Sequence, residues 1–266
     1  MSGEPKESAT FSSCRFNFLG VSYPELALID FLLSNNPEGL SIDNADTNSD
    51  CNVNISDVTM LIDYLLSGFW PWEHTYVDLG LPSGTLWATC NVGANSPEEY
   101  GDYFAWGETA PKDVYNWETY KWCNGSSTSI TKYCSNSSYG TVDNKTELES
   151  EDDAAYVNWG PSWRMPTREQ QRELVDNCSW TWTQQNSVNG YLVTGPNGKS
   201  IFLPAAGIRS NESLGLVGSY GFYWSRTLDP GSYCFYAYDL YINSMNVGWG
   251  NARENGLTFR AVRVSE

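Results

Sequence analysis

The chain has 266 residues, 41% of them hydrophobic, enough for two domains or one large one with a sizeable core. Its formal net charge is −17, and the 15 Lys and Arg are scattered among 32 Asp and Glu. Nucleic acids and anionic membranes are therefore poor partners, because binding phosphates requires clustered cations. No apolar run approaches the roughly 20 residues of a membrane-spanning helix.

The N-terminus and the cysteines give limited information about the compartment. Residues 1–7 carry no hydrophobic signal segment, so the protein is either cytosolic or exported by a signal that lies outside this chain. Seven cysteines show no zinc-ligand spacing, and their odd number argues against a complete disulfide framework. Cys123 and Cys134 flank a Ser- and Thr-rich loop and could pair, which the sequence alone leaves open.

An Asp- and Asn-rich segment, residues 46–57, has the oxygen spacing of a calcium loop. With Asp46 as position 1, side-chain oxygens fall at positions 1, 3, 5, 9 and 12, and position 7 offers a backbone carbonyl. Ca²⁺ takes about six to eight oxygen ligands. Cys51 and Asp57 depart from the Gly and Glu that an EF-hand has at positions 6 and 12. We predict calcium as a cofactor, with the ligands Asp46, Asn48, Asp50, Asn52, Asn54 and Asp57.

A helix is predicted directly after this loop. From Val58 onward, apolar residues recur with the spacing of one helical face, and Gly68 provides a stop. The segment at 61–68 repeats the segment at 28–35, so the loop and helix form a duplicated unit. In the first copy Arg15 stands where the second has Asn48, and a guanidinium repels a cation. We therefore predict one calcium site.

Duplicated loop–helix units with Asp at position 12 resemble the dockerin family. The resemblance covers about residues 13–69, after an N-terminal tail at 1–12. It implies a small helical module that binds calcium and docks onto a cohesin-like partner. A dockerin-like spacer that only stabilises the protein is the alternative. Residues 70–75 then form a linker, in which His74, the only histidine, is expected to be solvated.

From residue 76 to the C-terminus, strand and turn signals dominate. A hairpin is predicted at 76–90 around the turn Pro82–Gly84. A second is predicted at 190–203 around Gly195-Pro-Asn-Gly198, a strong hairpin signal. Later strands are predicted at 222–225, 234–242 and 257–264.

Two helices interrupt these strands. The first follows Asp152, a natural N-cap, and runs through Ala154–Val157. The second begins at Thr167, where Thr-Arg-Glu-Gln forms a capping box, and continues to Asn177. Segregated strands with few helices predict an α+β fold with antiparallel sheets rather than a doubly wound parallel sheet.

Several sequence blocks in this part carry a family resemblance, among them Asp102-Tyr-Phe-Ala-Trp-Gly-Glu108 and Trp163-Arg-Met-Pro-Thr167. Their order and spacing are similar to the Fibrobacter succinogenes major paralogous domain, abundant in secreted Bacteroidetes proteins, over residues 76–266. The resemblance implies a C-type-lectin-like fold whose first and last strands pair, here 76–79 and 259–264. It also implies an extracellular or cell-surface location. The other blocks lie at 77–89, 158–162, 202–207, 223–225 and 259–263.

Catalysis is not expected. The segment 163–169 is similar to a block of formylglycine-generating enzymes, which share the fold superfamily but need a C-terminal cysteine pair, and only Cys234 lies in that part. With His74 outside the predicted domain, no Ser-His-Asp or Cys-His arrangement is possible. Helix capping explains the acidic pair Asp152-Asp153.

The candidate ligand face lies late in the chain. Sugar-binding C-type lectins use Glu-Pro-Asn or Gln-Pro-Asp with calcium, and neither tripeptide occurs here. Residues 223–255 are instead dense in Tyr, Trp, Asn, Ser and Arg, a composition suited to recognition, although ordinary strand packing also accounts for it. Related lectin-like proteins place their variable ligand face in this part. We predict ligand contacts from segments that join or flank the late strands: Arg226, Asp229, Tyr233, Asn246, Trp249, Asn251 and Arg253.

The favoured hypothesis is a non-catalytic, secreted or cell-surface binding protein whose lectin-like domain recognises a glycan or a protein. The alternative is a structural module of a surface assembly, docked through the dockerin-like part. An enzyme is the third and weakest hypothesis.

Overall fold

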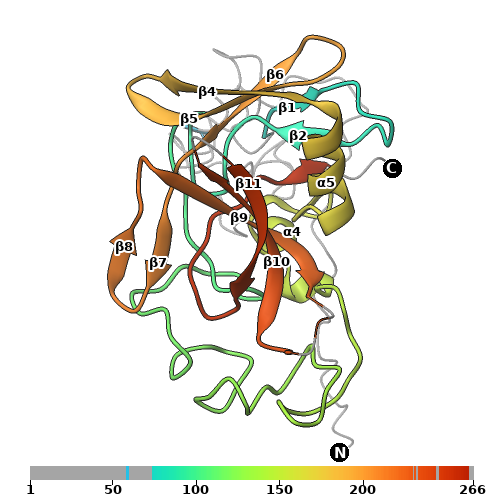
Figure 1. Cartoon of the computed structure of the whole chain (residues 1–266), viewed down its shortest axis with the longest axis vertical. Helices are drawn as coiled ribbons and strands as arrows, with labels where there is room; N and C mark the ends of the chain where they lie inside the picture. The colour runs from blue at the N-terminus through green and yellow to red at the C-terminus, as the bar shows by residue number, and fades with distance from the viewer. Residues whose placement is uncertain (1–57, 60–73, 230, 232, 244–245, 264–266) are drawn as a thin grey trace, which may run out of the picture. The chain divides into compact units, whose positions relative to one another are not determined.

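The computed structural model describes residues 58–59, 74–229, 231, 233–243 and 246–263 (Figure 1). The chain divides into two units, Met1–Glu73 and His74–Glu266. Val58 and Thr59 are helical, at the start of the helix predicted after the calcium loop. The calcium loop itself, with Asp46, Asn48, Asp50, Asn52, Asn54 and Asp57, lies outside the described residues. In the described part of the chain, no helix is long and apolar enough to cross a membrane.

The second unit is α+β, with antiparallel sheets. Its four-stranded sheet has the order β1-β2-β12-β3, built from β1 (Tyr76–Asp78), β2 (Leu86–Ala88), β12 (Val262–Arg263) and β3 (Trp163–Arg164). The predicted hairpin of β1 and β2 is confirmed. The expected pairing of the first and last strands is wrong, because β12 pairs with β2 and β3. Within the hairpin, β1 pairs with one edge of β2, so β12 pairs with its other edge.

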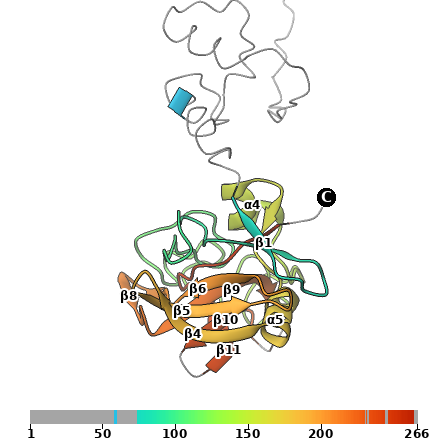
Figure 2. The same ribbon diagram turned by 90° about the horizontal axis from the view of Figure 1, so that it is seen from above.

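Two three-stranded sheets pack against each other in the second unit (Figure 2). One has the order β4-β5-β6, and its β5–β6 pair confirms the hairpin predicted around Gly195–Gly198. Gly198 has φ +83° and donates its N–H to the Gly195 carbonyl at 3.0 Å. The other sheet has the order β11-β10-β9, and a small hairpin, β7–β8, completes the set. The strands are β4 (Ser179–Gln185), β5 (Val188–Thr194), β6 (Ser200–Pro204), β7 (Ile208–Ser210), β8 (Ser213–Gly215), β9 (Tyr220–Leu228), β10 (Tyr236–Asn243) and β11 (Asn246–Ala252).

The two predicted helices are present as α4 (Ala154–Trp159) and α5 (Arg168–Asn177), with a 3₁₀ turn, η1 (Ser150–Asp152), before the first. The N-cap of α4 is Asp153 rather than Asp152, because the Asp153 carboxylate accepts from the backbone N–H groups of Ala155 and Tyr156. The capping box of α5 is confirmed: Thr167 and Gln170 bond each other's backbone N–H groups. The Ser83 N–H donates to Glu173 at 2.7 Å, which ties the β1–β2 turn to α5.

Aromatic side chains dominate the core of the second unit. Trp106 and Trp224 are 0% exposed, and their indole N–H groups donate to the Ser225 and Phe104 carbonyls, each at 2.8 Å. Trp87 lies in a second apolar cluster that joins β2 and α5 to the β4–β6 and β9–β11 sheets. Burial of rings this large supplies much of the hydrophobic stabilisation of a domain. This rigid interior fixes the positions of the loops described below.

Candidate ligand-binding site

Six of the seven predicted ligand-binding residues occupy three places in the structure, and the seventh, Arg253, follows β11. Arg226 lies on β9, and Asp229 and Tyr233 lie in the β9–β10 connection. Asn246, Trp249 and Asn251 were expected in loops, but they belong to strand β11, which pairs with β10. The side chains of Asn246 and Trp249 lie outside the description. Asn251, Arg226 and Asp229 are half-buried, whereas Tyr233 is 48% exposed.

Arg253 is wrongly assigned to the ligand face, because its side chain is fully buried. Its guanidinium donates to the carbonyls of Tyr133 (3.1 Å), Cys234 (2.8 Å) and Lys132 (3.1 Å). It also donates to the Tyr120 hydroxyl at 2.9 Å and lies 4.7 Å from the Trp106 ring centroid. A buried guanidinium is stable only when its donors and charge are compensated in this way. Arg253 is therefore a structural residue that ties Lys132 and Tyr133 to the β9–β10 connection.

Tyr233 belongs to a group of five aromatic rings that we call the Phe235 cluster: Trp117, Tyr139, Tyr233, Phe235 and Tyr236. Phe235 is the centre, with ring centroids 4.7 Å from Tyr236, 5.2 Å from Tyr233 and 5.5 Å from Tyr139. Trp117 packs edge-on against Phe235 at 6.3 Å. These spacings fall in the range of favourable tilted and edge-to-face ring pairs. Three distant stretches of sequence thus meet in one cluster.

A disulfide holds the base of the Phe235 cluster. Cys134 and Cys234 are bonded, with their Cα atoms 5.1 Å apart and 100 residues between them in sequence. The pairing of Cys123 with Cys134 is therefore wrong; Cys123 is free, and its thiol donates to the Trp117 carbonyl at 3.0 Å. Both bonded cysteines are buried beneath the rings. The disulfide and Arg253 together fix residues 133–139 against residues 233–236.

The Phe235 cluster presents tyrosine edges to solvent. Tyr233 is 48% and Tyr236 is 37% exposed; among the described tyrosines only Tyr76, on β1, is exposed to a similar degree. Neither hydroxyl has a hydrogen-bond partner among the residues that the structure describes. Such a surface offers apolar ring faces next to free hydroxyl groups, the combination that binding sites use. Sequence reasoning found Tyr233 and missed the other four; the run Tyr233-Cys-Phe-Tyr236 was the one local signal.

His74 was expected to be solvated in a linker, but it packs on the second unit. Its ring stacks on Trp159 with centroids 3.6 Å apart, and it contacts Trp163 edge-on at 6.1 Å. Burial lowers the pKa of His74 to about 4. The imidazole is therefore neutral at pH 7 and serves to pack the start of β1.

The acidic cluster Glu149, Glu151 and Asp152 is the one group of candidate metal ligands within the described residues. The Lys132 ammonium lies 2.6 Å from both Glu149 and Asp152 and 3.9 Å from Glu151, and Lys121 lies 3.2 Å from Asp152. Contacts with the Lys132 and Lys145 ammonium groups lower the pKa of Glu149 to about 2. Lysine thus already compensates these carboxylates, and the cluster is an ion-pair network.

Comparison of the chain with protein-family models, curated proteins and solved structures finds no match in any of the three.

Proposed function

We propose that residues 74–266 form a non-catalytic binding domain that recognises a glycan or a protein through the Phe235 cluster. The observation that carries the proposal is the exposure of Tyr233 and Tyr236 on a cluster fixed by a disulfide and a buried arginine. Prearranged rings lose little conformational freedom on binding, so more of their contact energy appears as affinity. Aromatic residues also supply much of the energy of known interfaces.

The fold and the location belong to the same proposal. Antiparallel sheets, two helices and a C-terminal strand that returns beside β2 are compatible with a C-type-lectin-like domain of the Fibrobacter succinogenes major paralogous type. The Cys134–Cys234 disulfide supports an oxidising, extracellular or cell-surface location, because disulfides persist in such compartments.

The binding test uses the full chain on glycan and protein arrays, followed by calorimetry with whatever binds. Tyr233→Ala should weaken binding by about 2 kcal/mol or more if the ring is central. Tyr76→Ala is the matched control, since Tyr76 is 44% exposed but lies on β1. Equal losses in both variants, or none in Tyr233→Ala, would contradict the proposal. Retention of a protein partner without any glycan binding would favour the structural-module alternative.

For the first unit we propose one calcium ion bound by the loop at 46–57, in a dockerin-like module that docks onto a cohesin-like partner. The support is the oxygen spacing from Asp46 to Asp57. Calcium titration of the full chain should give one site, which Asp46→Ala removes. Asn17→Ala, in the decayed first copy, should leave the site intact. Two sites of similar affinity, or none, would overturn this part.

A further inference from the structure

Strand β4 leaves one edge of the β4-β5-β6 sheet unpaired (Figure 2). Among the described strands it pairs only with β5, over all seven of its residues and without a register shift. A free edge carries a row of backbone N–H and C=O groups that can pair with another strand, and proteins usually protect it with charges, proline or a bulge. β4 has none of these, because its sequence is Ser-Trp-Thr-Trp-Thr-Gln-Gln.

The turn after β4 determines which of its backbone groups point outward. Asn186 and Ser187 have φ +48° and +67°, as the two central residues of a type I′ hairpin turn require. Gln185 and Val188, which flank this turn, form a hydrogen-bonded pair. Bonded and non-bonded pairs alternate along an antiparallel ladder, so every second residue of β4 directs its N–H and C=O away from β5. No other described segment bonds these backbone groups. They belong to Trp180, Trp182 and Gln184.

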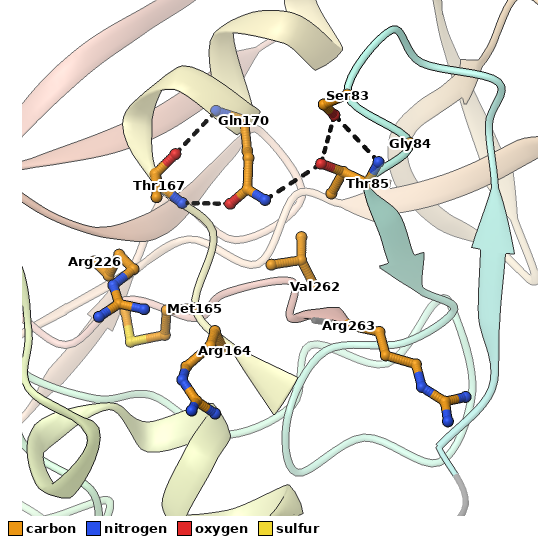
Figure 3. A pocket seen from close by; sticks show the side chains of 10 residues that line it. All are labelled: Ser83, Gly84, Thr85, Arg164, Met165, Thr167, Gln170, Arg226, Val262 and Arg263. Carbon is orange, nitrogen blue, oxygen red and sulfur yellow. Dashed lines mark hydrogen bonds between the residues drawn. The ribbon is translucent and has the colours of Figure 1, made fainter. Parts of the chain in front are cut away.

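Both ends of β4 are held in place. At its start, α5 leads into β4 and is itself attached to β2, because Gln170 Nε2 donates to Thr85 Oγ1 at 3.2 Å (Figure 3). At its end, Gln185 Nε2 donates to the Glu98 carboxylate at 3.2 Å, and the Asn186 amide donates to the same carboxylate. A strand that is already extended and fixed loses little conformational freedom when another strand pairs with it.

The other outer strands of the described sheets are less open than β4. β9 makes isolated bridges to three further segments, at Gly221, Tyr223 and Thr227. β11 contains two glycines, and a register shift interrupts its pairing with β10. β6 ends at Pro204, and β1, β3, β7 and β8 have at most three residues. Among the described strands, β4 is therefore the longest regular edge without protection.

A second copy of the same strand fits this edge. Antiparallel pairing about a two-fold axis at Trp182 aligns all seven residues and sets the outward residues opposite one another. In this register Trp182 faces Trp182 of the second copy, and Trp180 faces Gln184. On the other face of the strand, Thr181 lies opposite Thr183. Aromatic and Thr–Thr pairs across strands are favourable. No like charges meet within the paired strands, although each chain has a net charge of −17.

We propose that two copies of the chain pair through β4 and join their β4-β5-β6 sheets into one continuous sheet. The pairing adds about six backbone hydrogen bonds, because each of three facing pairs exchanges two. It also covers the half-buried rings of Trp180 and Trp182, which pack edge-on against Tyr191 at 5.4 and 5.1 Å. One pair of strands buries less surface than a permanent dimer interface, so the dimer is reversible. This proposal is independent of the Phe235 cluster.

The first test is the mass of the full chain in solution. Small-angle scattering from about 10 μM to about 1 mM should show the mass rise from one chain to two. Added sodium chloride should strengthen the dimer, because salt screens the repulsion between two acidic chains. A monomer over the whole range would overturn the proposal.

Hydrogen exchange then tests whether β4 is the paired edge. The amides of Trp180, Trp182 and Gln184 should exchange rapidly in dilute protein and become protected at high concentration. Those of Thr181 and Thr183 bond β5 and should be protected at both concentrations. A dimer that leaves the three outward amides unprotected would place the contact elsewhere and refute the assignment to β4.

Two double variants test the register. Thr181→Lys with Thr183→Lys sets lysine opposite lysine twice across the axis, which should weaken the dimer about tenfold or more, although it lowers the net negative charge. Thr181→Lys with Thr183→Glu sets lysine opposite glutamate and should restore the dimer. Both variants carry two charges on the same face of β4, so only the proposed register separates them.

Leu214→Lys is the matched control on another edge, because Leu214 is exposed on β8. It should leave the dimer unchanged. Equal dissociation constants for the two double variants, or loss of the dimer in Leu214→Lys, would refute the proposed pairing. Should both double variants fold poorly, the protection of the three outward amides in the wild-type chain still decides.

Discussion

The domain contains two kinds of aromatic packing, and their difference separates structure from recognition. In the core, Trp106 and Trp224 are fully buried and each indole N–H has a backbone carbonyl partner. In the Phe235 cluster the rings contact one another just as closely, yet Tyr233 and Tyr236 remain exposed, and their hydroxyls have no partner among the described residues. Ring contacts alone therefore do not identify a core. Core rings are distinguished from surface rings by two properties: whether the N–H or hydroxyl has a hydrogen-bond partner, and how exposed the ring is.

The largest expected effect is in the core. Trp87 is 1% exposed, so Trp87→Ala should lower the free energy of unfolding by about 3–5 kcal/mol, measured by urea denaturation. Trp87→Phe sharpens the comparison, because Trp87 Nε1 is buried without a partner among the described residues. It should cost less than Trp224→Phe, which removes a buried hydrogen bond from the indole N–H to the Phe104 carbonyl. The reverse order would show that the indole N–H of Trp87 is satisfied after all.

Arg253 connects the two kinds of packing and gives the next largest effect. Arg253→Lys keeps the charge but cannot reach the carbonyls of Lys132, Tyr133 and Cys234 together. Each buried acceptor left unpaired costs about 1–3 kcal/mol, so we expect a loss of about 3 kcal/mol or more in thermal or urea unfolding. Ligand affinity per folded molecule should change little, because Arg253 itself does not reach the surface and affects binding only through the packing of the Phe235 cluster. A variant of normal stability that has lost binding would restore Arg253 to the ligand face.

Strand β10, which begins at Tyr236 of the Phe235 cluster, carries a buried acid, Asp239, so we expect the stability of the domain to depend on pH. Asp239 Oδ1 accepts from the Gly250 N–H at 2.6 Å, and Oδ2 is buried without a partner in the described residues. Burial raises the pKa of Asp239 from 3.8 to about 7. The folded state thus holds a proton that the unfolded state has released, so stability falls as pH rises from about 4 to about 7.

Asp239→Asn should remove that dependence. At about pH 8, where the wild-type carboxylate is charged in the folded state, the variant should be more stable, by an amount on the order of a few kcal/mol. At about pH 4, where the wild-type group is protonated in the folded state, the two proteins should unfold at nearly the same denaturant concentration. A variant that is equally destabilised at both pH values would mean that the Oδ1 contact with Gly250 matters more than the charge.

The sequence predicted those features whose signals are local. The Gly195-Pro-Asn-Gly198 hairpin and the Thr167 capping box depend on residues next to one another, and both are confirmed. Asp152 and Asp153 are equivalent as N-caps in sequence, and the geometry selects Asp153. Glycines at 248 and 250 made β11 resemble a loop, although backbone pairing with β10 overrides that preference.

Contacts between distant residues could not be predicted in this way. The Cys134–Cys234 bond spans 100 residues, and no spacing rule favours it over Cys123–Cys134. Arg253 lies among polar residues typical of a loop, and its burial depends on the carbonyls of Lys132, Tyr133 and Cys234. The Phe235 cluster is likewise assembled from three separate segments. The calcium loop at 46–57 lies outside the described residues and stays a prediction.

The smallest expected effect concerns the surface ring itself. Tyr233→Ala should cost about 1–2 kcal/mol of unfolding free energy, because the ring pairs with three others but is half exposed, and an aromatic pair contributes roughly 0.5–1.5 kcal/mol. Phe235→Ala should cost more, since Phe235 is less exposed and contacts all four other rings. Urea unfolding of the two variants measures the difference. If Tyr233→Ala destabilised the protein as much as Phe235→Ala, the exposed tyrosine would be part of the structural packing. That result would contradict the assignment of the cluster as a recognition surface.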